Sequence, residues 1–241
     1  MSRPQTPVHN IVPRSSKLVV PSSSIESCPT DSDVSIFCWN VLADTFLMKN
    51  VREYAHIPHE WKVWDRRCPA ILDEIESADA DIVCLQEVEF KAFDQDFKPK
   101  LAALGYSAAM QSDNKRSQKH SSGVATFWKR DKFELVVNSS RSRAMTVVLK
   151  DQVHRVLAVC NVHLEGHPML STARVKQLQN SLRELAMKHS HNALVVVGDF
   201  NCQMRSSACG AYLSFGSCPP GLLEWGESVH AELRPFSVLS R

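Results

Sequence analysis

The segment 194–201 constrains the fold most, because an apolar run passes directly into a glycine and then into two polar residues. A continuous apolar run bounded by a turn signal is typical of a strand that is buried on both faces. Gly198 ends this predicted strand and permits a tight turn. Asp199 and Asn201 follow at its carboxyl end, where α/β sheets commonly bind ligands, and residues two apart point to the same side. The alternative interpretation is a structural Asx turn.

The composition is that of an ordinary globular protein. The chain has 241 residues, of which 44% are hydrophobic and 22% charged, so it is long enough for one large or two small domains. The net charge of +2 indicates that any nucleic-acid contact must come from a local basic patch. The eight cysteines form no C-x-x-C pair, which favours free thiols in a reducing compartment over disulfides or structural zinc. No apolar run approaches the roughly 18 residues of a membrane span.

The chain is predicted to divide at about residue 33. Residues 1–33 are rich in Ser and Pro and contain no acidic residue before Glu26, which predicts a disordered leader. Residues 34–241 carry all the predicted strands and helices and are expected to form the folded domain. The free thiols and absent signals predict a cytoplasmic or nuclear protein, while the basic leader leaves organelle targeting as the alternative.

Hydrophobic periodicity predicts strands alternating with helices along this domain. Single strands are expected over 34–40, 82–85, 106–111 and 193–198. Helices are expected over 64–75, 91–104, 172–189 and 206–214. Two antiparallel hairpins are expected, one pairing 123–128 with 133–137 and the other pairing 143–149 with 155–162. Residues 49–62 are expected to form a loop.

Four of the predicted strands end in polar residues that can bind a metal or a phosphate. Asn40, Glu87 and His163 end three of them, and Asp199 with Asn201 follows the fourth. Each of these residues alone is more often structural or exposed, but four such endings rarely coincide by chance. Mg²⁺ prefers oxygen ligands and needs only one or two carboxylates beside its waters. We therefore predict that Glu87 and Asn40 bind Mg²⁺, with Mn²⁺ as the alternative ion.

The same residue types suit phosphodiester hydrolysis. Asp199 can orient or deprotonate the attacking water, while Asn201 and His163 can stabilise charge on the non-bridging oxygens. The polar segment 112–122 carries Lys115 and Arg116, which we predict to contact substrate phosphates. The alternative is that this segment is a solvated loop without such a role.

Five motifs resemble, in order, those of the endonuclease/exonuclease/phosphatase superfamily, and the resemblance covers about residues 34–215. The motifs are Cys-Trp-Asn-Val-Leu-Ala-Asp at 38–44, Asp-Ile-Val-Cys-Leu-Gln-Glu-Val-Glu at 81–89, Gly-Val-Ala-Thr-Phe-Trp at 123–128, Asn-Val-His-Leu at 161–164 and Gly-Asp-Phe-Asn at 198–201. The first two are most similar to the carbon-catabolite-repressor deadenylase branch, which includes the nocturnin and Angel proteins. The resemblance implies an α/β fold of the DNase-I-like kind, a four-layer α/β/β/α sandwich of two facing mixed sheets.

The resemblance also implies an activity and a role for each residue. Glu87 becomes a metal ligand with Asn40 as its neighbour, His163 and Asn201 contact the phosphate, and Asp199 orients the nucleophilic water. The expected function is Mg²⁺-dependent 3′-exoribonuclease activity on RNA with a 3′ adenosine tail. The alternatives are a small-nucleotide or inositol-phosphate phosphatase, and a catalytically inactive binding module.

Two features depart from the family pattern. The family ends in a Ser-Asp-His-type motif, whereas here no Asp follows Asp199 and the one later histidine is His230. We therefore expect the domain to lack its last strands and one catalytic histidine, which leaves the activity of this polypeptide open. The branch also carries an Asn near 141–144, where this chain has Arg143 as the expected substitute in substrate binding.

Overall fold

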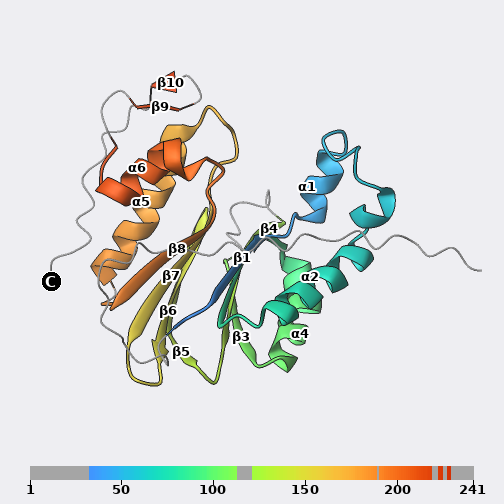
Figure 1. Ribbon diagram of the computed structural model, residues 1–241, viewed down its shortest axis with the longest axis horizontal. Helices are drawn as coiled ribbons and strands as arrows, with labels where there is room; N and C mark the ends of the chain where they lie inside the picture. The colour runs from blue at the N-terminus through green and yellow to red at the C-terminus, as the bar shows by residue number, and fades with distance from the viewer. Residues whose placement is uncertain (1–32, 113–120, 189, 219–221, 225–226, 229–241) are drawn as a thin grey trace, which may run out of the picture. The chain divides into compact units, whose positions relative to one another are not determined.

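The computed structural model describes residues 33–112, 121–188, 190–218, 222–224 and 227–228 (Figure 1). The chain divides into two compact units, Met1–Asp33 and Val34–Arg241, and the following account concerns the second unit. The predicted leader, the basic residues Lys115 and Arg116, and His230 lie outside the described residues.

Two mixed sheets form the centre of this unit within the described residues. The first has the order β1-β2-β4-β3, built from Ile36–Asn40, Ile82–Glu89, Ser122–Lys129 and Tyr106–Met110. The second has the order β5-β6-β7-β8, built from Phe133–Arg141, Ala144–Asp151, Val156–His163 and Ala193–Asp199. The pairs β1–β2 and β7–β8 are parallel, and the other pairs are antiparallel. A short antiparallel pair, β9 and β10, covers Leu223–Glu224 and Glu227–Ser228.

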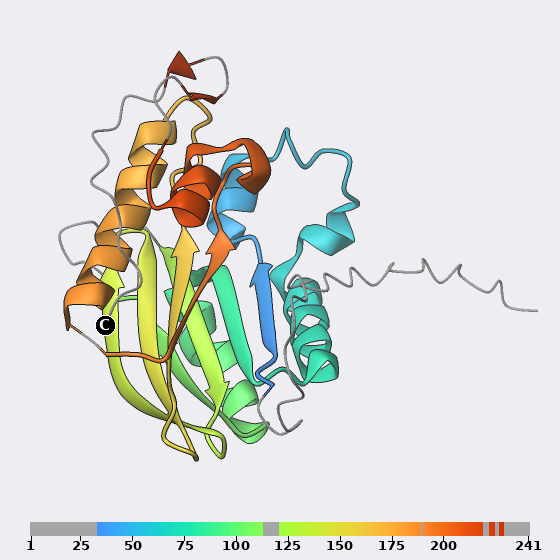
Figure 2. The same ribbon diagram turned by 60° about the vertical axis from the view of Figure 1, so that its left-hand side comes forward.

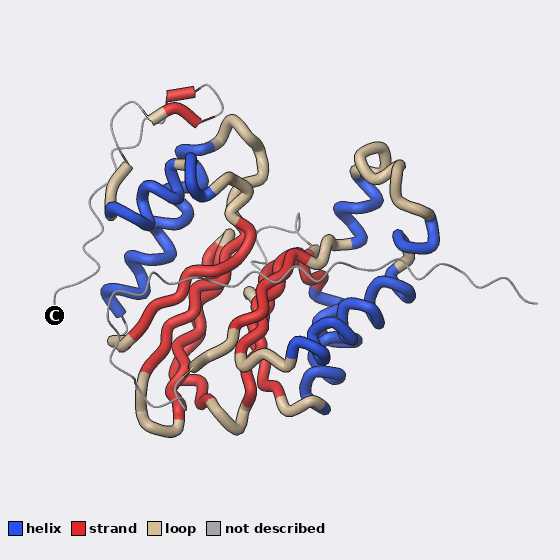
Figure 3. The backbone as a smooth tube through the Cα atoms, viewed as in Figure 1, coloured by secondary structure: helices blue, strands red, loops and turns tan. Residues whose placement is uncertain are grey.

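Helices cover the outer face of each sheet (Figure 3). The first sheet is covered by α2 (Trp64–Ala78) and by a continuous helical segment made of α3 (Phe90–Ala92), the π-helical turn Phe93–Phe97 and α4 (Lys98–Ala103). The second sheet is covered by α5 (Ser171–Lys188) and α6 (Ala208–Phe215). The remaining helical segments are α1 (Asp44–Lys49) and two 3-10 turns, His59–Lys62 and Met204–Ser206. These layers confirm the predicted four-layer α/β/β/α sandwich.

Alternation along the strands produces the apolar layers of the sandwich. In β2, Val83 and Leu85 pack against the helices, whereas Ile82 and Cys84 face the second sheet. The other buried members of the layer between the sheets are Ala109, Val124, Trp128, Phe133, Met145, Val147, Leu149 and Val159. The second outer layer joins α5 and α6 to the second sheet through Cys160, Val162, Val175, Leu178, Leu182 and Tyr212. None of the described helices has the length and apolarity that crossing a membrane requires.

The predicted hairpin between 123–128 and 133–137 is wrong. These residues form β4 and β5, but β4 belongs to the first sheet and β5 pairs with β6 in the second. The chain instead crosses between the sheets, which lets Trp128 and Phe133 both enter the apolar layer between them. The second predicted hairpin is confirmed, since residues 144–150 of β6 pair with residues 156–162 of β7.

The expectation that the strand at 193–198 is buried on both faces is also wrong. The strand forms as β8, but its residues are half-buried or exposed because, among the described residues, β7 is its one neighbour in the sheet. The fully buried runs lie instead in β2, β6 and β7. The expected loop at 49–62 contains one 3-10 turn, and α1 lies in a segment for which we predicted no helix.

Candidate active site

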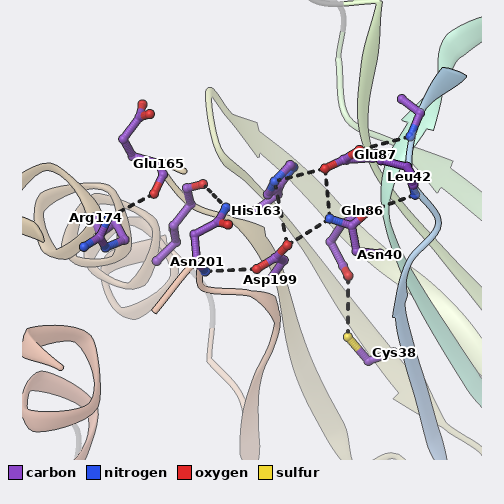
Figure 4. A network of polar contacts seen from close by, with 12 residues as sticks. Cys38, Asn40, Leu42, Gln86, Glu87, His163, Glu165, Arg174, Asp199 and Asn201 are labelled. Carbon is purple, nitrogen blue, oxygen red and sulfur yellow. Dashed lines mark hydrogen bonds and ion pairs between the residues drawn. The ribbon is translucent and has the colours of Figure 1, made fainter. Parts of the chain in front are cut away.

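The strand ends that the sequence singles out meet at one edge of the sandwich (Figure 2). The carboxyl ends of β1, β7 and β8 point the same way, and Asn40, His163 and Asp199 are the last residues of these strands. Glu87 lies near the carboxyl end of β2, which runs parallel to β1, so it is at the same edge as Asn40. Because these strands belong to both sheets, the site lies where the two sheets face each other (Figure 4).

The side-chain amide of Asn40 joins the two sheets at this edge. Its Nδ2 donates to Oε1 of Glu87 at 3.0 Å and to Oδ2 of Asp199 at 2.8 Å. Its Oδ1 accepts the backbone N–H of Leu42 at 3.0 Å, which fixes the orientation of the amide. One donor group therefore holds a carboxylate from each sheet at the same point and offsets part of their mutual repulsion.

A bulge in β2 aims Glu87 into the site. The pairing with β4 shifts register between Leu85 and Val88, and Glu87 adopts the left-handed conformation with φ of 58°. Such bulges redirect side chains next to functional sites. Oε2 of Glu87 accepts the backbone N–H of Ala43 at 3.0 Å, so both carboxylate oxygens are held. The strand continues to Glu89, so the prediction that it ends at Glu87 is wrong.

His163 lies between the two carboxylates. Its Nε2 is 3.7 Å from Oε1 of Glu87 and 4.0 Å from Oδ2 of Asp199. Burial lowers the pKa of His163 below its ordinary value, against the opposing effect of both carboxylates, which keeps the ring neutral at pH 7. A neutral imidazole can still donate one N–H to a phosphate oxygen.

Asp199 begins a tight turn that includes Asn201. Oδ1 of Asp199 accepts the backbone N–H of Asn201 at 2.9 Å, so the Asx turn weighed as an alternative forms within the site itself. The side-chain Nδ2 of Asn201 donates to the carbonyl of Leu164 at 2.9 Å. Asn201 is therefore adjacent to Asp199, but its side-chain amide is directed away from the contacts that Asn40 makes with Glu87 and Asp199.

Arg143, the predicted substrate-binding residue, lines an open groove beside His163. Its Nη2 forms an ion pair with Oε2 of Glu165 at 2.9 Å. The groove has a volume of about 780 Å³ and extends from His163 over the surface of both sheets and α5. Its other lining residues include Phe46, Phe90, Gln111, Ser112, Ser122, Arg141, Gln177, Asn180, Arg183 and Glu184.

Two buried amides beneath the site were not predicted. Nε2 of Gln86 donates to Oδ1 of Asn161 at 2.8 Å, which bridges the two sheets. Nδ2 of Asn161 donates to the carbonyls of Leu85 and Ala125 at 3.2 and 3.0 Å, and Asn161 is fully buried. The available signal was an Asn inside an otherwise apolar strand, two residues before His163.

Arg67 of α2 supports the loop that follows Asn40, and it too was missed. Its Nη1 donates to the carbonyls of Val41 and Leu42 at 3.0 and 2.8 Å, and its Nη2 forms an ion pair with Asp44. These contacts hold the segment whose backbone N–H groups bind Asn40 and Glu87. No local sequence signal distinguishes Arg67 from an ordinary helix residue.

The donor set fits a hard divalent cation with few protein ligands. Within the described part of the chain, no group of three or more His, Cys, Asp or Glu side chains could hold a metal ion. Mg²⁺ tolerates such a site, because it keeps several waters and needs one or two carboxylates. Glu87 accepts one hydrogen bond at each oxygen, which leaves lone pairs for an ion. Asn40 presents Nδ2 rather than Oδ1, so here it positions Glu87 and offers no oxygen ligand.

Comparisons with known proteins show which sequences this chain is similar to. The endonuclease/exonuclease/phosphatase family model matches residues 38–234. Protein angel homolog 2 of Danio rerio is 29% identical over 192 residues, which cover 70% of this chain and 33% of that protein. CCR4-NOT transcription complex subunit 6-like-A of Xenopus laevis is 33% identical over 175 residues, covering 64% and 30% respectively. The chain thus spans about a third of the length of these relatives.

Solved structures show the same architecture. The crystal structure of ANGEL2, a 2′,3′-cyclic phosphatase, aligns with a TM-score of 0.71 at 25% identity and covers 85% of this chain and 64% of that one. The human nocturnin catalytic domain with bound sulfate anion aligns with a TM-score of 0.58 at 22% identity, covering 75% and 69%. The nocturnin comparison supports the fold.

Proposed function

The chain belongs to the endonuclease/exonuclease/phosphatase family, and from this premise we propose that the site around Asn40 hydrolyses phosphodiester bonds of RNA with Mg²⁺ as cofactor. One observation carries the proposal: a single amide holds the carboxylates of Glu87 and Asp199 together beside His163. Two carboxylates and a neutral imidazole on one edge can serve an ion, a water and a phosphate at once.

Glu87 is the proposed ligand of the cation. When Mg²⁺ is bound, it supplies positive charge that offsets the negative charge of the phosphate. The chain keeps Glu87 ready for this role through the bulge in β2 and through the N–H groups of Asn40 and Ala43. Its carboxylate is therefore already oriented, which reduces the reorganisation needed on binding.

Asp199 is the proposed acceptor of the proton from the attacking water. Its two oxygens are fixed by different donors, Nδ2 of Asn40 and the backbone N–H of Asn201. His163 donates its N–H to a non-bridging oxygen of the phosphate, where negative charge increases. Asn201 was predicted to contact the scissile phosphate. For this role its side-chain amide must release the carbonyl of Leu164 and donate its hydrogen bond to the substrate instead.

The first candidate substrate is an RNA with a 3′ adenosine tail, shortened from its end. The resemblance of the strand-end motifs to the deadenylase branch supports it, as does the similarity to the CCR4-NOT subunit. The groove beside His163 offers a polar surface with Arg141 and Arg143, along which a nucleotide chain can lie.

The second candidate is a 2′,3′-cyclic phosphate at an RNA end. The similarity to ANGEL2, whose structure is that of a 2′,3′-cyclic phosphatase, favours this substrate. Opening such a ring is also the hydrolysis of one phosphodiester bond, so the same residues would serve it.

A substrate panel tests the proposal. The purified full chain is incubated with Mg²⁺, or with EDTA, and with four substrates: RNA with an adenosine tail, RNA with another tail, RNA ending in a 2′,3′-cyclic phosphate, and an inositol phosphate. We expect Mg²⁺-dependent product that EDTA abolishes. Stepwise shortening indicates the exoribonuclease, and ring opening without shortening indicates the cyclic phosphatase. A folded protein that converts only the inositol phosphate contradicts the proposal and favours the phosphatase alternative. A folded protein that converts none of the four also contradicts it and favours an inactive binding module.

A further inference from the structure

Two phenylalanine side chains line the groove beside His163. Phe46 lies in α1 and Phe90 is the first residue of α3, so the rings reach the groove from two different elements. Both side chains are half-buried, whereas the other described residues that line the groove are polar or glycine. The hydrolytic roles proposed above use neither ring.

Hydrogen bonds hold the backbone next to both rings. Oε1 of Glu89 accepts the backbone N–H of Thr45 at 2.8 Å and the Oγ1 hydroxyl of Thr45 at 2.9 Å. The backbone N–H of Phe90 donates to the carbonyl of Ser121 at 3.0 Å. Thr45 and Glu89 each directly precede a phenylalanine, so these contacts join the two segments that carry the rings.

The same two segments carry groups of the hydrolytic site. The backbone N–H of Ala43, three residues before Phe46, donates to Oε2 of Glu87 at 3.0 Å. Glu87 itself lies three residues before Phe90. His163 lines the same groove, and its Nε2 is 3.7 Å from Oε1 of Glu87. The rings therefore lie in a groove that opens directly beside the proposed metal ligand.

The helix α5 supplies polar side chains to this groove. Gln177, Asn180 and Glu184 line it at spacings of three and four residues, which places them on one face of the helix. In Figure 1, α5 and α1 lie on opposite sides of the strands that end at this edge. The groove thus has aromatic rings on its α1 side and amide and charged groups on its α5 side.

Arginine side chains make the groove positive. Three arginines and one glutamate are among the described residues that line it. Arg141 forms an ion pair with Glu184. Arg143 forms its ion pair with Glu165, and Arg183 is exposed on α5. Guanidinium groups bind phosphate oxygens through charge-assisted hydrogen bonds, so this side of the groove suits an anionic chain.

We propose that Phe46 and Phe90 stack against unpaired bases of a single-stranded RNA whose phosphates lie along the arginines, a specificity that rests on the proposed function. A phenyl ring has no hydrogen-bonding group and contacts a base through its flat face, which every base has. In a duplex the neighbouring base pairs already cover these faces. The rings therefore select single strands without selecting a sequence, and an inositol phosphate offers them no base.

Binding of a fluorescent single-stranded RNA to the full chain tests the proposal without hydrolysis. Anisotropy is measured in EDTA. Phe46→Leu and Phe90→Leu keep an apolar side chain but lose the flat ring, so each should weaken binding by at least about fivefold. Phe46→Tyr and Phe90→Tyr keep the ring and should bind within about twofold of the wild type.

Phe215→Leu is the matched control, because Phe215 is 76% exposed at the end of α6 and does not line the groove. It should bind RNA as the wild type does. Circular dichroism checks that every variant is folded. The proposal is overturned if the wild type does not bind the RNA, or if folded Phe46→Leu and Phe90→Leu bind it as tightly as the control.

Abasic nucleotides separate stacking from a merely structural effect of the rings. Bases are removed one at a time from the last few nucleotides of the same RNA. At a stacked position, removal should weaken binding to the wild type by at least about fivefold. In the leucine variant of the ring concerned, the same removal should have little further effect, because both changes delete one contact. Fully additive losses at every position would mean that the rings do not stack on bases.

Base identity and pairing provide the remaining comparisons. Exchanging the stacked base for another should change affinity less than removing it. A duplex of the same sequence can still bind through its phosphates, but Phe46→Leu and Phe90→Leu should leave that binding unchanged. Equal losses for duplex and single strand would contradict recognition of unpaired bases.

Hydrolysis distinguishes this inference from the proposed function. With Mg²⁺, Phe46→Leu and Phe90→Leu should raise KM for single-stranded RNA by at least about fivefold and leave kcat nearly unchanged. If RNA binds as described but no ester is hydrolysed, the proposed function fails and the stacking stands. If RNA is hydrolysed with the same KM by the leucine variants and the wild type, the stacking is wrong and the hydrolytic site stands.

Discussion

At the scale of single residues, the side-chain amide of Asn40 determines most of the geometry of the candidate site. It donates to carboxylates of two different sheets, and its own oxygen is held by the N–H of Leu42. No other arrangement of that amide satisfies all three contacts, because the carboxylates need a donor and the N–H needs an acceptor. Glu87 and Asp199 therefore depend on Asn40 for their relative position.

Replacing Asn40 tests this dependence. In Asn40→Ala the two carboxylates lose their shared donor and move apart, so kcat should fall by about 10²–10³, with a smaller change in KM. Steady-state kinetics on the ester that the wild type hydrolyses measures the effect. The matched control is Asn138→Ala, at an exposed position of β5. Equal kcat values for Asn40→Ala and the control would show that the amide does not organise the site.

Gly198 occupies a position in β8 that only glycine fits. Its φ is 137°, and a Cβ there would lie 2.0 Å from the carbonyl oxygen of Val162 in β7. Gly198→Ala should therefore cost at least about 3 kcal/mol of folding free energy or prevent folding. Urea unfolding measures the change. The control is Gly166→Ala, where a Cβ meets Nδ2 of Asn201 at an ordinary 3.7 Å and should change stability by less than about 1 kcal/mol. Similar values for both variants would contradict this account.

At the scale of the elements, strands deliver the catalytic side chains and buried polar groups hold the strands in place. Asp81, before β2, is nearly fully buried and accepts hydrogen bonds from the N–H and Oγ of Ser35 and from Nζ of Lys132. It thereby connects the start of β1 with the crossing from β4 to β5. Beneath the site, Asn161 of the second sheet is connected by hydrogen bonds to Gln86 and to the carbonyl of Ala125 in the first sheet.

Asp81 makes stability depend on pH. Burial alone would raise the pKa of Asp81, but the hydrogen bonds from Lys132 and Ser35 outweigh it and lower the pKa. A lowered folded-state pKa stabilises the fold above the unfolded-state pKa of about 4, and that stabilisation is lost as the pH falls through the folded-state value. Asp81→Asn should cost about 1–2 kcal/mol at pH 7, and the cost should be smaller at pH 3, below the unfolded-state pKa.

Urea unfolding of the wild type and Asp81→Asn at both pH values measures this difference. Asp131→Asn, at an exposed position of the same crossing, is the control and should change little at either pH. A gap between wild type and Asp81→Asn that stays the same at pH 3 would refute the assignment.

Asn161 is expected to matter for stability as much as for the site. In Asn161→Leu the side chain of Gln86 and the carbonyls of Leu85 and Ala125 lose their partners inside the sandwich, which should cost about 2–5 kcal/mol. Equilibrium unfolding measures the loss, with Asn138→Leu on the exposed side of β5 for comparison. A variant as stable as the wild type would mean that water replaces these bonds.

The strand-end residues could be predicted because they depend on local pattern. An apolar run followed by Asn40, Glu87, His163 or Asp199 is visible in the sequence, and parallel pairing brings such ends together. The crossing from β4 to β5 could not be predicted, because the short segment between them suits a hairpin equally well. The contacts of Asn161 and Arg67 could not be predicted either, since their partners are backbone carbonyls far away in the chain.

At the scale of the whole folded unit, the site exists only where the two sheets face each other. Asn40 and Glu87 come from one sheet and His163 and Asp199 from the other, so neither sheet carries a complete set. The layer of apolar side chains between the sheets and the bridge from Gln86 to Asn161 fix this juxtaposition. The two sheets must therefore be packed together before the proposed hydrolysis can occur.

The most direct measurement is the initial rate of Mg²⁺-dependent phosphodiester hydrolysis by the wild type, Glu87→Gln and Asp199→Asn. Glu60→Gln and Asp73→Asn make the same two substitutions at exposed positions and serve as controls. We predict that EDTA abolishes the wild-type rate, that each site variant lowers it at least about 10²-fold while remaining folded, and that the controls keep it. A wild-type rate that survives in Glu87→Gln or Asp199→Asn would contradict a hydrolytic site built on these two carboxylates.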